Sequence, residues 1–150
     1  MKDDKDDKEQ HQRDYCSVSF RIIGNDLEPS KITTLLGIEA NISHKKGDPK
    51  IGVSKSGKII KYAPFDTGLW CIESNLDKHS RIQEHLMNLI ERIASKKDIL
   101  IQFGNDGFKM DFYCGYFFSV TNQTGVSLTN EALKRITELG IDLNIDLYAF

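Results

Sequence analysis

The chain has 150 residues, 39% of them hydrophobic and 28% charged, a composition typical of one soluble globular domain. Its formal net charge of -2 lacks the basic excess that general nucleic-acid binding requires. No apolar run approaches the length of about 20 residues that a membrane-spanning helix needs. We therefore expect a cytoplasmic protein that binds neither nucleic acid nor a membrane.

The first 14 residues are the most polar part of the chain. They carry six acidic and four basic side chains, which account for the whole net charge. A segment with so little to bury cannot offset the entropy of ordering. We predict a disordered acidic arm over residues 1–14 and a single α+β domain over residues 15–150.

The first elements of the domain are a strand and a short helix. Residues 15–23 alternate between apolar and polar side chains, which predicts a half-buried strand. Pro29 suits the first turn of a helix because that turn needs no backbone donor, and Gly37 suits the left-handed position that ends one. Residues 44–58 carry no such pattern and are expected to form a long, mobile loop.

Two strands and a second helix follow. The strands are predicted over residues 57–63 and 68–74, with the turn "PFDTG" between them. Ser80 and Gln83 have the spacing of a capping box at the start of a helix. An apolar stripe at helical spacing continues this helix through Ile82, Leu86, Leu89, Ile90 and Ile93.

The last third of the chain predicts a hairpin, a helix and a final strand. The hairpin pairs residues 98–103 with residues 108–120 through the turn Gly-Asn-Asp-Gly. The helix begins after Thr129 and ends at Gly140. The final strand covers residues 141–150.

The order of these elements is β-α-β-β-α-β-β-α-β. Its first six match the ferredoxin-like pattern. We therefore predict an α+β fold with a mostly antiparallel sheet and three helices on one face. A ferredoxin-like βαββαβ core is extended in it by a βαβ unit, and the other face of the sheet is partly open.

A lysine-rich loop is the first candidate binding site. Lys45, Lys46 and Lys50 lie close to Asp48 in the sequence, without the order of residues that a phosphate-binding Walker loop requires. The charge favours docking of an acidic protein partner. A lysine-rich loop that is merely solvated is the alternative.

The open face of the sheet is the second candidate. Its residues are Arg21, Asp111, Tyr113, Asp146 and Tyr148. Aromatic residues and arginine are enriched at the centres of protein interfaces, so this mixed surface also predicts partner binding. An exposed face with no partner is again the alternative.

The sequence predicts no catalytic residue, metal site or other cofactor. The four histidines and three cysteines lack the spacings of zinc ligands, and the cysteines lie in apolar, strand-like segments typical of core packing. The rival hypothesis is a nuclease or phosphate-ester hydrolase that uses His44 and Asp48, or the sheet-face carboxylates with a metal.

Several landmarks resemble the bacterial family called domain of unknown function 4279. They are "GNDLEPSKITTLLGIEA", "KKGD", "GLWCIES", "IQEHLMNLIERI" and "LGIDLNIDLYAF", and the resemblance covers about residues 16–150. It implies a small bacterial cytoplasmic α+β protein with no established reaction and no catalytic residues. Lys46-Gly47-Asp48 is the matching motif that the predicted helices and strands do not explain.

Three functional hypotheses follow. The leading one is a non-enzymatic binding protein, of the immunity type, that neutralises a toxin domain by occluding it. The second is the hydrolase described above. The third is a homodimeric scaffold whose open sheet face is its own partner.

Overall fold

The computed structural model describes residues 13–122 and 125–150. Its main sheet has five strands in the order β2-β5-β1-β6-β7. These are β2 (Ile42–His44), β5 (Gly68–Glu73), β1 (Tyr15–Gly24), β6 (Lys109–Phe118) and β7 (Asp142–Ala149). β6 and β7 run parallel, and the other neighbours are antiparallel. The sheet is therefore mixed, which corrects the prediction of a mostly antiparallel sheet.

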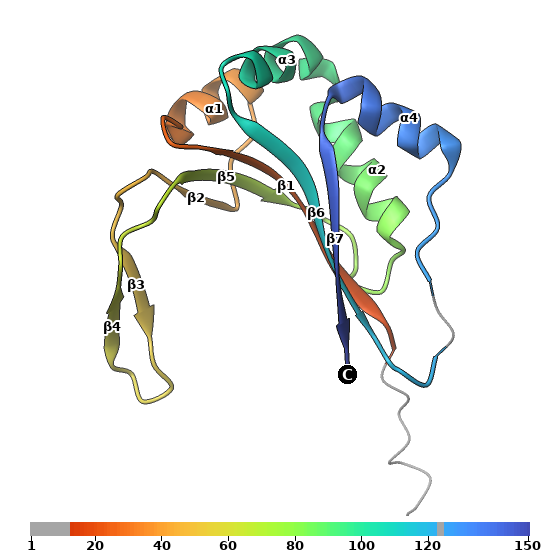
Figure 1. Ribbon diagram of the computed structural model, residues 1–150, viewed down its shortest axis with the longest axis horizontal. Coiled ribbons are helices and arrows are strands. Elements are labelled where there is room, and N and C mark those ends of the chain that lie inside the picture. Colours follow the sequence, from red (N-terminus) through yellow and green to blue (C-terminus); the bar gives the residue numbers. More distant parts are fainter. Residues whose placement is uncertain (1–12, 123–124) are drawn as a thin grey trace, which may run out of the picture.

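The helices cover one face of this sheet (Figure 1). They are α1 (Pro29–Leu36), α2 (Ile82–Ile93), the 3-10 helix η1 (Ala94–Lys96), α3 (Lys97–Asn105) and α4 (Asn130–Leu139). The core lies between the helices and the sheet, where Phe20, Trp70 and Phe112 are completely buried. The α+β class and the helices predicted near Pro29, Ile82 and Asn130 are confirmed.

The predicted ends of α1 and α4 are also confirmed. Pro29 opens α1, and Gly37 ends it with a φ of 68° that suits a residue without a Cβ. The Thr129 hydroxyl caps α4 by accepting a hydrogen bond from the Ala132 N–H at 3.2 Å. These local rules therefore placed both helices correctly.

The capping box of α2 lies one residue later than predicted. Arg81 is the cap residue, and its backbone N–H donates to the Glu84 carboxylate at 3.0 Å. Gln83 instead accepts from the backbone N–H of Thr129 at 2.7 Å and so links α2 to the start of α4. The Ser80–Gln83 capping box is wrong because a long-range hydrogen bond uses Gln83.

The strand predicted over residues 98–103 is wrong, since these residues belong to α3. Leu100 and Phe103 are buried three positions apart, whereas Ile101 is 44% exposed. Burial at that spacing is helical. The predicted hairpin turn is the C-terminal end of this helix, where Phe108 N donates to Phe103 O at 3.1 Å.

The segment predicted as a loop over residues 44–58 contains strand structure. β2 ends at His44, and β3 (Lys50–Val53) pairs with β4 (Ile59–Tyr62) in a separate antiparallel sheet. The "PFDTG" turn led us to expect that β4 pairs with β5, but β4 pairs with β3 instead. Figure 1 shows this β3–β4 hairpin projecting away from the helical layer.

The predicted acidic arm lies almost entirely outside the described residues. Its last residue, Asp14, is described and accepts hydrogen bonds from the Tyr116 hydroxyl at 2.9 Å and the Ser119 N–H at 3.1 Å. The folded part therefore includes Asp14. Among the described helices, none is long and apolar enough to cross a membrane.

Candidate functional site

The "KKGD" motif forms a tight turn at the base of the β3–β4 hairpin. The Asp48 carboxylate accepts a hydrogen bond from Lys45 N at 2.8 Å, and Gly47 adopts a φ of 85°. Phe65 closes the base from the other side, because Gly47 N donates to Phe65 O at 2.8 Å and Phe65 N donates to Asp48 O at 3.1 Å. Asp48 and Gly47 thus have a structural role that the sequence did not reveal.

A ring stack supports the same turn. His44, at the end of β2, lies flat against Phe65 with ring centroids 3.5 Å apart. The Nδ1 atom of His44 is buried without a hydrogen-bond partner. His44 and Asp48 are the pair named in the hydrolase hypothesis. In the structure His44 stacks on Phe65 and Asp48 caps the turn, so both side chains have structural contacts.

The hairpin presents an apolar surface to solvent. Ile51, Val53 and Ile59 are 59%, 71% and 70% exposed, and the strand register places them on one side of the ribbon. Tyr62 lies on the other side, where a Cβ on Gly52 would come within 2.8 Å of its ring. Neighbouring large apolar side chains that are each more than half exposed are typical of interaction sites.

Lysines lie on both sides of the hairpin, and the register places Lys61 on the same side as Ile51 and Ile59 but Lys50 on the side of Tyr62. Lys50 Nζ lies 5.8 Å from the centre of the Tyr62 ring and 5.5 Å from that of Phe65. The lysines of the segment are Lys45, Lys46, Lys50, Lys55, Lys58 and Lys61. Asp48 and Asp66 are the acidic residues between positions 45 and 66. The hairpin is therefore both apolar and strongly basic.

The sheet-face residues predicted from alternation do come together, on the face away from the helices. Arg21 Nε and Nη2 donate to the two oxygens of Asp111 at 2.8 and 2.6 Å. The Arg21 guanidinium lies 4.3 Å from the centre of the Tyr113 ring. The sequence missed Asn144, whose side chain donates to Asp111 at 2.8 Å. Both oxygens of Asp111 are thus satisfied within the chain.

The other two predicted residues extend this network along β7. The Tyr113 hydroxyl donates to Asp146 at 2.7 Å and lies 3.3 Å from the Tyr148 hydroxyl. These hydrogen bonds, with Tyr148 first and Asp146 second, raise the pKa of Tyr113. The phenol is therefore a stable donor and not a base at neutral pH.

A row of stacked aromatic rings runs across the same face from β1 to β7 and shares Tyr148 with this network. Tyr15 stacks on Phe117 with centroids 4.6 Å apart, and Phe117 stacks on Tyr148 at 4.7 Å. Gly115 leaves room for the row, since a Cβ there would lie 3.3 Å from the Phe117 ring. Because the ring faces cover one another across the strands, the Phe117 faces are not available to stack on a planar ligand.

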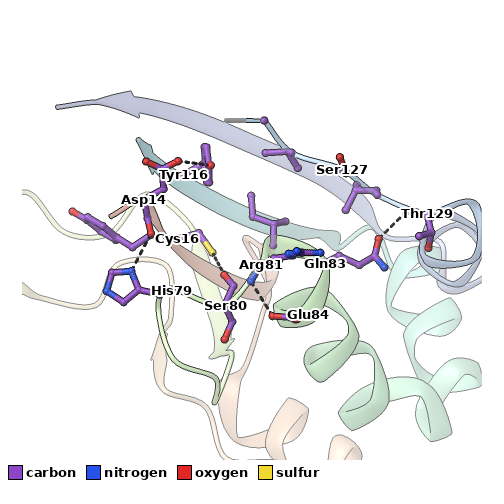
Figure 2. A pocket seen from close by; sticks show the side chains of 15 residues that line it. Asp14, Cys16, His79, Ser80, Arg81, Gln83, Glu84, Tyr116, Ser127 and Thr129 are labelled. Atoms are coloured by element: carbon purple, nitrogen blue, oxygen red, sulfur yellow. Dashed lines mark hydrogen bonds between the residues drawn. The ribbon is translucent and has the colours of Figure 1, made fainter. Parts of the chain in front are cut away.

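A cleft of about 630 Å³ lies between α2 and the start of β1 (Figure 2). Two of its side chains contact backbone oxygens across the cleft, since His79 Nδ1 lies 3.0 Å from Asp14 O and Cys16 Sγ donates to Ser80 O at 3.4 Å. Gln83 and Glu84 make the backbone hydrogen bonds described above. The hydrogen bonds of His79 and Cys16 connect the start of β1 to the residues that precede α2.

The described residues bring together no group of three or more histidine, cysteine, aspartate or glutamate side chains that could hold a metal ion. Burial raises the pKa of Cys16 to about 11 and of Cys114 to about 12, and it also raises the pKa of Cys71. A thiol with a raised pKa is a poor nucleophile at neutral pH. These cysteines therefore pack the fold and do not supply a reactive centre.

We expect the three cysteines to resist labelling in the native protein. All three are free and buried, so a thiol reagent such as Ellman's reagent should react with none of them within minutes at pH 7.5. In guanidinium chloride all three should react at once. Rapid reaction of one thiol under native conditions contradicts this assignment and identifies that residue as a candidate nucleophile.

The comparison with known families agrees with the landmarks quoted above. A model described as "Domain of unknown function (DUF4279)" matches residues 14–150. The chain belongs to this family. No curated protein and no solved structure matches the chain. The match begins at Asp14, the residue that ties the start of β1 to β6 through Tyr116.

Proposed function

We propose that this member of the DUF4279 family is a non-enzymatic protein-binding domain whose β3–β4 hairpin docks an acidic partner. The observation that carries the proposal is the combination of exposed Ile51, Val53 and Ile59 with four lysines on the projecting hairpin and two more in the turn at its base. An isolated two-stranded hairpin is at best marginally stable in water. A partner that covers this apolar side would stabilise it.

Charge and backbone both suit such a partner. Lysines around an apolar patch attract an acidic protein at long range and orient it on approach. β3 and β4 form a sheet of two strands, so each has an unpaired edge within the described part of the chain. A strand of the partner would add to such an edge through backbone hydrogen bonds.

The biological role we propose is neutralisation of a toxin domain in the bacterial cytoplasm. A hairpin that inserts its apolar side into an acidic active-site cleft would exclude substrate without any chemistry of its own. The supporting features are the basic charge of the hairpin and its exposed apolar side. The open sheet face is the second surface proposed for partner binding, through Arg21, Tyr113 and Tyr148.

We also propose that β2, β5, β1 and β6 form a ferredoxin-like core. Their order in the sheet and their antiparallel pairing match a βαββαβ unit in which α1 and α2 are the crossover helices. The hairpin is then an insertion between β2 and β5. An insertion that leaves the core intact is a common place for a binding function.

Two hairpin variants test the proposal. The charge variant carries Lys45→Gln, Lys46→Gln and Lys50→Gln, and the apolar variant carries Ile51→Ser, Val53→Ser and Ile59→Ser. In quantitative affinity capture from the native lysate, we expect one stoichiometric acidic partner with the unmodified chain and its loss with the apolar variant. The charge variant should slow association roughly tenfold at low salt and much less at high salt.

A matched control has Lys96→Gln, Lys97→Gln and Lys134→Gln, which remove the same charge from the helical side. This control should capture the partner as the unmodified chain does. Unchanged affinity and association rate in both hairpin variants exclude the hairpin as the docking site. For the toxin role, the captured partner alone should arrest growth, and co-expression of the unmodified chain, but not of the apolar variant, should restore it.

A further inference from the structure

The outer edge of β7 is a long strand edge without a neighbour. In the described part of the chain β7 pairs with β6 alone, which leaves one side of Asp142–Ala149 without strand partners. A free edge presents unpaired backbone donors and acceptors to any other strand. The opposite edge of the sheet differs, because β2 has only three residues there.

The sequence of β7 lacks most of the features that usually protect an edge, and its only charged residues are two aspartates. "DLNIDLYA" has no lysine, proline or glycine, and its pairing with β6 continues without a bulge from Asp142 to Ala149. Its two aspartates lie on the open face and not on the helix-side face. Such an edge is suited to pairing and is not blocked against it.

The apolar side of β7 is also incompletely covered. Leu147 is 64% exposed and, together with Ile145 and Phe118, lines an apolar groove of about 350 Å³. Figure 1 shows that the C-terminal end of β7 extends beyond the helices. An additional strand beside β7 would extend the sheet at this point and cover part of the groove.

We propose that the occupant of this edge is a second copy of the same chain. The two β7 strands pair antiparallel about a two-fold axis that passes between Ile145 of one copy and Ile145 of the other. Each five-stranded sheet then continues into its partner, with both helical layers on the same side. This proposal is independent of the hairpin, which lies at the other end of the sheet beside β2 (Figure 1).

The side chains of β7 select this register. Residues directly opposite in an antiparallel pair share a face of the sheet, so a one-residue shift would set apolar side chains against polar ones. With Ile145 on the axis, Leu143 lies opposite Leu147 on the helix-side face. On the open face Asn144 lies opposite Asp146, and Asp142 lies opposite Tyr148. No two carboxylates are then directly opposed.

The neighbouring registers are worse. With Asn144 on the axis, each Asp142 lies opposite an Asp146, and with Asp146 on the axis the two Asp146 side chains oppose one another. Like charges directly opposite destabilise a strand pair. Registers centred on Leu143 or Leu147 pair fewer residues of each strand. The edge is therefore self-complementary in one register.

Cysteine cross-linking tests both the dimer and its register. Directly opposed residues of antiparallel strands have Cα atoms about 4.5–5.5 Å apart, within the range that a disulfide spans. Under mild oxidation, Ile145→Cys should cross-link with itself. Leu143→Cys and Leu147→Cys should each remain uncross-linked alone and cross-link when the two proteins are mixed. The native cysteines are buried and give a low background.

Light scattering supplies the second readout. The unmodified chain should have twice the 17.1 kDa mass of one copy, and Leu147→Lys should restore the single-copy mass without changing the circular dichroism spectrum. Leu133→Lys, at an exposed leucine of α4, is the matched control and should stay dimeric. A single-copy mass for the unmodified chain, or self-cross-linking of Leu143→Cys as strong as that of Ile145→Cys, overturns the proposal.

Discussion

Replacing Trp70 with alanine should lower the free energy of unfolding by about 4 kcal/mol. Trp70 is completely buried at the centre of the core and meets the edge of Phe20 with ring centroids 6.3 Å apart. Its indole Nε1 donates to the Thr33 hydroxyl at 3.0 Å and so joins β5 to α1. Denaturant unfolding followed by far-ultraviolet circular dichroism measures the loss, because the substitution removes the only tryptophan of the chain.

Two further variants separate packing from hydrogen bonding at this position. Trp70→Phe retains most of the ring and loses the donor, and Thr33→Val retains the ring and leaves the indole N–H without its acceptor. Each should cost about 1–3 kcal/mol, less than Trp70→Ala. A loss below about 1.5 kcal/mol for Trp70→Ala would show that α1 and β5 close over the vacated space, and Trp70 would then not be central to the core.

Patterns within a single element predicted much of the fold. α1 and α4 follow from residues that act on their own backbone, since Pro29 fits the first turn, Thr129 caps, and Gly37 and Gly140 end the helices. β1 follows from strict alternation, because one side of it is buried and the other is not. Such rules succeed wherever the cause of the structure is local.

The errors occur where the cause is not local. Residues 98–103 are a short apolar run, which fits a strand or a buried helix equally well, and only the packing of Leu100 and Phe103 against the core decides between them. The parallel pairing of β7 with β6 depends on the crossover through α4, which no pattern inside β7 encodes.

The candidate sites show the same division. Alternation placed Arg21, Asp111 and Tyr113 on one face, but the hydrogen bond from Asn144 depends on the register between β6 and β7. Asp48 was predicted as part of a docking loop and is also the cap of the turn that carries the hairpin. Its carboxylate accepts from the backbone N–H three residues earlier, a local contact within the sequence "KKGD" that our prediction did not consider.

Replacing Asp111 with alanine should be the most damaging change on the open face of the sheet, at about 3 kcal/mol. Asp111 is 7% exposed, and its two oxygens accept from Arg21 and Asn144. Alanine would leave the Arg21 guanidinium over the Tyr113 ring without its carboxylate partner. Since the Arg21 side chain is 29% exposed, water relieves part of this cost, and we expect the lower end of the range for buried ion pairs.

Asp146→Ala is the matched control, because Asp146 lies on the same face but is exposed, and it accepts one hydrogen bond, from the Tyr113 hydroxyl. It should cost at most about 1 kcal/mol. The double variant Arg21→Met with Asp111→Leu should recover most of the stability that Asp111→Ala loses, since no charge is left without a partner. Chemical denaturation of all three variants measures these differences.

The same variants separate stability from binding on this face. If the Arg21–Asp111 pair acts only within the fold, the stable double variant captures the partner as the unmodified chain does. If the double variant is stable but captures less partner, the pair contributes to the interface directly, because a partner would then meet the guanidinium stacked on Tyr113. Equal losses of stability for Asp111→Ala and Asp146→Ala would contradict a central role of Asp111 in the network on this face.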